Sequence, residues 1–168
     1  MLQQEYDTNA TNLLVSILLR FPEIISLHLD MPNKSASFTF MLSSRIKKEE
    51  FIAFKTVLKE YLSAYRELTG ISIAVEANLQ HAGKVSLLVL STATDYLTLE
   101  SIQLICGTVC NIFTEKVIRE TVAGVFTHEE EIARQEEIID YLLSHSKEAR
   151  QENLVAFRES GKVFVYGK

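Results

Sequence analysis

The chain has 168 residues, of which 47% are apolar and 23% charged, and its 22 acidic residues exceed its 17 basic ones to give a net charge of −5. This size and composition are typical of a globular domain that folds without disulfides or metal, which excludes the disordered and disulfide-scaffold classes. The acidic balance and the lack of a basic cluster argue against a nucleic-acid partner, because that binding depends on neutralised phosphates.

The N-terminal segment and the cysteines predict a cytoplasmic protein that makes no membrane contact. Residues 1–7 are acidic where a secretory signal needs positive charge. The apolar residues within 13–19 end at Arg20, far short of the roughly 20 residues that span a bilayer. Cys106 and Cys110 lie four residues apart in a predicted helix, a geometry that disfavours a disulfide and fits a reducing compartment.

The first predicted elements are a helix and a β-hairpin. Asp7 or Asn9 is the expected cap of the helix, which ends before Phe21. Residues 25–42 alternate between apolar and polar side chains on either side of a turn at 32–34, which predicts a hairpin with one buried face. The apolar positions expected to face the core are Ile25, Leu27, Leu29, Met31, Ala36, Phe38, Phe40 and Leu42.

A long helix and a second hairpin follow. Apolar residues spaced by three and four predict a core-facing helix over 47–68, which stops at Thr69 and Gly70. A second alternating segment over 71–89 turns at 80–83. The helix stripe consists of Phe51, Phe54, Leu58, Tyr61, Tyr65 and Leu68, and the expected inward positions of the hairpin are Ile71, Ile73, Val75, Ala77, Leu79, Val85, Leu87 and Val89.

A second helix over 97–116, with Asp95 or Thr98 as its cap, completes a repeated pattern. The two hairpins start 46 residues apart and each is followed by a helix, which indicates a duplicated ββα unit. The predicted fold class is therefore α+β, with a four-stranded antiparallel sheet of order 2-1-3-4 and the helices on one face. Residues 1–126 form this predicted core domain together with the N-terminal helix.

Residues 127–168 are predicted to form an acidic helix and a terminal hairpin, either part of the same globule or exchanged with a neighbouring chain. Residues 117–126 before them fit a short strand or a loop equally well. Thr127 and Glu130 have the spacing of a capping box, and the helix is expected to run to about Arg150. Between residues 128 and 152 there are eight acidic and three basic residues, an excess equal to the whole net charge.

The terminal hairpin has a specific predicted register. A two-residue turn at Ser160 and Gly161 places Glu159 opposite Lys162 and Phe157 opposite Phe164, and both pairs are favourable across antiparallel strands.

The polar face of the predicted sheet contains the candidate chemistry. Ser26, His28 and Asp30 follow one strand, and Glu76 and Asn78 follow its predicted neighbour. A histidine beside carboxylates can act as a general base, so His28, Asp30 and Glu76 are candidate catalytic residues, and Ser26, His28 and Asn78 are candidate ligand-binding residues. The alternative is a solvated or interfacial face, which is the usual state of an antiparallel sheet with polar residues on one side.

Apolar residues are also expected on this face. Leu88 and Leu90 are predicted to point outward from an edge strand, with Met41 on the opposite edge. Exposed apolar residues favour coverage by another element or a second subunit, so these three residues are candidate interface positions.

Motifs for metal, cofactor or nucleophilic chemistry are absent from the sequence. Cys106 and Cys110 have no second ligand pair at zinc-site spacing, and no phosphate loop, dinucleotide fingerprint or nucleophile elbow occurs. The sequence predicts an association or regulatory module that self-associates or binds a protein partner, without metal or cofactor and with an enzyme less favoured. The alternative is a small-ligand sensor or enzyme with a pocket over the open sheet face.

Overall fold

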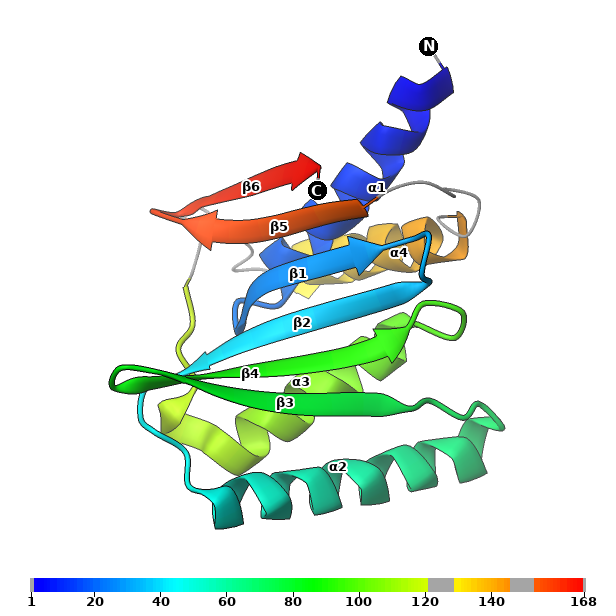
Figure 1. The fold of residues 1–168 in the computed structure, drawn as a ribbon. Helices are drawn as coiled ribbons and strands as arrows, with labels where there is room; N and C mark the ends of the chain where they lie inside the picture. The colour runs from blue at the N-terminus through cyan, green and yellow to red at the C-terminus, as the bar shows by residue number, and fades with distance from the viewer. Residues whose placement is uncertain (1, 121–128, 146–152, 168) are drawn as a thin grey trace.

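The computed structural model describes residues 2–120, 129–145 and 153–167, which form four α-helices, a short 3₁₀ helix and six strands. Helix–hairpin units occur three times along the chain, as α1-β1-β2, α2-β3-β4 and α4-β5-β6, with α3 between the last two (Figure 1). The bounds are α1 Leu2–Arg20, β1 Ile24–Asp30, β2 Ser35–Leu42, α2 Lys48–Thr69, β3 Val75–Ala82, β4 Val85–Ala93, α3 Leu99–Phe113, η1 Thr114–Lys116, α4 Glu129–His145, β5 Asn153–Glu159 and β6 Lys162–Gly167.

All six strands form one antiparallel sheet of order β3-β4-β2-β1-β5-β6. The α+β class is confirmed, but the predicted strand order 2-1-3-4 is wrong: β4 pairs with β2, and β1 pairs with β5 of the terminal hairpin. The alternation of apolar and polar residues predicts which segments are strands but not which strands pair, because any strand edge offers the same backbone donors and acceptors. The duplication of a ββα unit stays a prediction.

The helices lie on one side of the sheet and enclose the core (Figure 1). Helix α1 packs against α4 and the β1-β5-β6 half of the sheet, and α3 packs against α2 and α4. Helix α2 lies beyond the β3 edge, where Phe54 meets Phe113 of α3 with ring centroids 5.3 Å apart. The largest fully buried side chains are Phe38, Phe40, Phe54, Leu13, Leu14, Ile17, Leu18, Ile24, Leu27, Leu42, Leu88 and Leu90.

The ends of α2 and α3 confirm the predicted stop and cap. Gly70 has a φ of +76° and donates its N–H to the Arg66 carbonyl at 2.8 Å, a left-handed helix end that glycine adopts without strain. Thr98 caps α3: its Oγ1 accepts the Ser101 N–H at 3.1 Å, and Ser101 Oγ accepts the Thr98 N–H at 2.9 Å.

Two details near the N-terminus differ from prediction. Helix α1 begins at Leu2, so Asp7 and Asn9 lie inside it and do not cap it. The pairing of β1 with β2 is irregular between Ile24 and Ser26, so that Ile24 is buried and Ile25 is half-exposed. A bulge of this kind reverses the alternation at its position, which the sequence pattern does not reveal.

The prediction that Leu88 and Leu90 face outward is wrong, because both are fully buried in the core. The tight loop at Gly83 pairs Ala82 with Val85, and this register places Leu88 opposite the inward Leu79. Leu87 and Val89, predicted to be inward, are therefore the outward residues of β4. The run Leu87–Leu90 is apolar on both sides of the strand, so the loop and not the hydrophobic pattern decides which side faces the core. Strand β3 forms the edge, and Met41 lies on β2 inside the sheet.

The terminal hairpin has the predicted register, with Glu159 opposite Lys162 and Phe157 opposite Phe164. Within 117–126, Val117 forms a single bridge to Leu42, and residues 121–126 lie outside the described part of the chain. Thr127, the predicted cap, also lies outside it, and α4 is described as far as His145.

Candidate functional site

The side of the sheet opposite the helices, here called the open face, is uncovered by the described helices (Figure 1). Cross-strand partners point to the same side of a sheet, so the strand pairings assign its residues. The outward residues include Ser26, His28 and Asp30 on β1; Ser35, Ser37, Thr39 and Met41 on β2; Glu76, Asn78 and Gln80 on β3; Val85, Leu87, Val89 and Ser91 on β4; Asn153, Val155, Phe157 and Glu159 on β5; and Lys162, Phe164 and Tyr166 on β6.

His28 and Glu76 belong to one row across the open face but do not meet. The pairings run from His28 through Ser37 and Ser91 to Glu76, and the two serine hydroxyls hydrogen bond at 2.9 Å. Strands β2 and β4 therefore separate the histidine from the carboxylate by about 14 Å, which is three strand spacings. Ser26 and Asn78 occupy the next row and are separated by the same two strands.

His28 has an amide partner. Its Nε2 lies 2.6 Å from Asn153 Oδ1 on β5. Because an amide oxygen only accepts, the ring nitrogen Nε2 is the donor in this contact. Sequence reasoning missed Asn153, since nothing in the local pattern placed the terminal hairpin beside β1.

Asp30 organises the turn between β1 and β2. Its carboxylate accepts the Asn33 backbone N–H at 3.3 Å and the Asn33 Nδ2–H at 2.8 Å. Such aspartate-centred turns are a common structural use of this residue. These two hydrogen bonds give Asp30 a role in the turn.

A concave region borders the open face at the β1–β2 turn. It has a volume of about 480 Å³, and its lining includes Glu76, Ser91, Lys34 and the exposed Tyr96. Of the predicted site residues, Glu76 contributes to this lining, whereas Ser26, His28, Asp30 and Asn78 are not part of it.

An aromatic cluster occupies the β5–β6 end of the open face. Phe157 stacks on Phe164 with centroids 5.5 Å apart and meets Tyr166 edge-on at 5.8 Å. Phe164 and Tyr166 remain 44% and 49% exposed. The Phe157–Phe164 pair was predicted as a hairpin contact, but its place on the open face became visible only from the pairing of β5 with β1.

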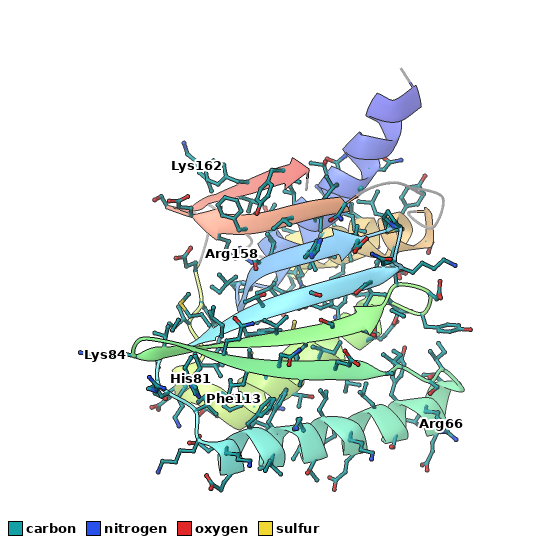
Figure 2. The ribbon with its side chains drawn as sticks, in the orientation of Figure 1. Arg66, His81, Lys84, Phe113, Arg158 and Lys162 are labelled. Carbon is teal, nitrogen blue, oxygen red and sulfur yellow. The ribbon has the colours of Figure 1, made fainter. Side chains whose placement is uncertain are left out.

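The open face has few charges at its centre. The outward residues of the interior strands β2 and β4 are serine, threonine, leucine, valine and methionine. The charged outward residues lie on the edge strands or at strand ends, as with Lys162 at the β5–β6 turn (Figure 2). Depletion of charge together with aromatic residues and methionine is typical of the centre of a protein interface.

The cysteines do not form a reactive site. Both thiols are free, and Cys106 is buried. Burial, followed by the nearby Glu23, raises the pKa of Cys106 well above its ordinary value, so the thiolate is disfavoured. Burial also raises the pKa of Cys110. Among the described residues, no group of three or more His, Cys, Asp or Glu side chains is placed to hold a metal ion.

Comparison with protein-family models, curated proteins and solved structures finds no match to this chain. In the described part of the chain, none of the helices combines the length and apolar character that crossing a bilayer requires.

Proposed function

We propose that the protein is an association module that forms a homodimer through its open sheet face. The observation that carries this proposal is the composition of that face: strands β2 and β4 are charge-poor and contribute Met41, Leu87 and Val89, and the half-exposed Phe164 and Tyr166 lie at the β6 end of the same face. An uncovered apolar and aromatic surface of this kind marks interaction sites on folded proteins. The free thiols fit the expected cytoplasmic location.

A second copy of the chain suits this face because a two-fold interface brings the same surface together with itself. Like charges at its centre would repel, and strands β2 and β4 have none among their outward residues. Two such faces can pack as aligned sheets about 10 Å apart, with the aromatic side chains filling the layer between them. The net charge of −5 is located largely elsewhere, in the acidic segment 128–152.

Sedimentation of matched variants tests this proposal. We expect the wild-type chain to sediment as a dimer of twice 19.1 kDa, and Phe164→Asp to shift it to the monomer by placing a charge in the interface. Ile138→Asp on α4 is the control, because Ile138 is 41% exposed, close to the 44% of Phe164, and lies on the helical side. A wild-type monomer at concentrations up to about 0.1 mM, or equal behaviour of the two variants, would refute dimerisation through this face.

The small-ligand or enzyme alternative has weaker support. It requires a concave site that contains His28 with a carboxylate within reach. His28 instead hydrogen bonds Asn153, and the neighbouring cavity is lined by Glu76 and Lys34 without His28.

A further inference from the structure

A groove separates α2 from the edge strand β3. It has a volume of about 400 Å³, and its apolar lining includes Leu58 and Leu62 of α2 and Val75 and Ala77 of β3. Val75 and Ala77 point toward the helical side but are only half-buried. Helix α2 lies beyond the free edge of β3 (Figure 1), and Val75 and Ala77 line the groove between the two elements.

The C-terminal half of α2 lacks the core contacts that its sequence predicts. Phe54 and Leu58 are buried, as expected for the helix stripe, but Tyr61 is 40% exposed and Leu68 is 86% exposed. The stripe is therefore fully buried only in its first half, and in the second half Tyr65 is half-buried and its hydroxyl lies 3.2 Å from Thr98 Oγ1. Beyond that point, the apolar surface of α2 borders the groove through Leu62.

Three cations line the α2 wall of the groove: Lys55, Lys59 and Arg66, the last at the C-terminal end of the helix (Figure 2). All three are exposed, and none forms an ion pair with another described residue. No acidic residue is among the described residues that line the groove. In a chain of net charge −5, this local positive charge selects for an acidic ligand.

The free edge of β3 offers backbone hydrogen-bonding groups to that ligand. Strand β3 has β4 on one side and forms the end of the sheet on the other. An extended peptide can pair with such an edge through its main chain, while alternate side chains enter the neighbouring groove. Strand addition uses both features of the groove, the apolar lining and the unpaired edge of β3. A ligand without a peptide backbone would leave the backbone groups of that edge unused.

We propose that the groove binds an extended acidic peptide segment of a partner protein, which adds a strand to β3. Lys55 and Lys59 are about 6 Å apart along the helix axis at about 1.5 Å per residue. Side chains on the same face of an added strand repeat at about 6.6 Å, so successive carboxylates on that face match the two lysines. Apolar side chains of the segment would cover Leu62 and Val75.

A second copy of this chain is a poorer occupant of the groove. Pairing β3 with the β3 strand of another copy brings two sets of Lys55, Lys59 and Arg66 toward one interface, where like charges repel. This inference goes beyond the proposed homodimer, because the groove and the open face are different surfaces of the molecule.

Selection of a random octapeptide display library on the full-length protein tests the inference. We expect enriched sequences to be rich in Asp and Glu, and the best synthetic peptide to bind the wild-type protein in a fluorescence anisotropy titration. Lys59→Glu should weaken that binding at least tenfold. Lys84→Glu makes the same charge change at the tip of the β3–β4 hairpin, outside the groove, and should leave binding unchanged (Figure 2).

N-methylation of the selected peptide distinguishes strand addition from other binding modes. A strand at an edge donates hydrogen bonds from alternate residues, so methylation should abolish binding at every second amide and be tolerated at those between. Enrichment of neutral or basic sequences, equal binding to the Lys59→Glu and Lys84→Glu proteins, or the absence of alternation would overturn the proposal. Phe164→Asp should leave peptide binding intact, which separates this result from that of the dimer.

Discussion

At the residue scale, the least expected feature is the buried guanidinium of Arg158 on β5. The residue is only 6% exposed. Its Nε donates to the Ile24 carbonyl at 2.9 Å, and its Nη2 donates to the carbonyls of Phe21 at 2.6 Å and of Leu18. Burial lowers the pKa of Arg158, opposed by Glu23 and Glu120. The side chain thereby binds carbonyl groups between the last turn of α1 and the start of β1, and it satisfies the Leu18 carbonyl, one of the last four that a helix leaves unpaired.

Arg158→Met should lower the free energy of unfolding by about 3 kcal/mol, because it leaves buried carbonyl groups without donors. Arg134→Met removes an exposed arginine from α4 and should change stability by less than about 0.5 kcal/mol. Urea denaturation of both variants measures the difference. Equal midpoints for the two proteins would show that the Arg158 hydrogen bonds do not stabilise the fold.

At the element scale, Glu50 connects the start of α2 to the segment after α3. Its Oε2 accepts a hydrogen bond from Lys116 Nζ at 2.9 Å, and its Oε1 accepts the Lys47 N–H at 3.4 Å. The hydrogen bond from Lys116 lowers the pKa of Glu50 from its ordinary value, and the Lys47 N–H acts in the same direction. The contact fixes the helix start and thereby one end of the α2–β3 groove.

Glu50→Gln should therefore reduce stability in a pH-dependent way. A carboxyl group whose pKa is depressed in the folded state stabilises the fold above its unfolded pKa of about 4.3, and loses that effect as the pH falls through the folded pKa. Because both partners are partly exposed, we expect a loss of about 0.5 kcal/mol near neutral pH that disappears at acidic pH. Glu49→Gln, in the same helical turn, is the control. An equal loss in both variants at every pH would mean that helix-dipole effects, and not Lys116, explain the result.

At the scale of the whole molecule, the terminal hairpin completes the sheet. Strand β5 pairs with β1 along Ser26–Asp30 and contributes the buried Leu154 and Ala156 to the core. Helix α1 packs against both strands of the hairpin. This places residues 153–167 within the same core as the preceding strands.

Truncation after residue 152 should accordingly abolish cooperative unfolding. It removes the partner of β1, the Arg158 donors and two core side chains, a loss well beyond the usual few kcal/mol of a point change. Near-UV circular dichroism and urea denaturation measure the outcome. A truncated chain with the wild-type midpoint would instead support the sequence-based hypothesis of an independent core over 1–126.

Sequence alone predicts the local elements: the six strands, the stop at Gly70, Thr98 as one of two candidate caps, and the register of the terminal hairpin. These depend on contacts between residues close along the chain, where periodicity, caps and turn chemistry act directly. Tertiary structure alone decided that β4 lies beside β2 and β5 beside β1, and therefore that His28 meets Asn153 and not a carboxylate. It also decided which residues of the uniformly apolar run Leu87–Leu90 face the core. Strand edges offer identical backbone groups, so packing and chain connections, and not the local pattern, select their partners.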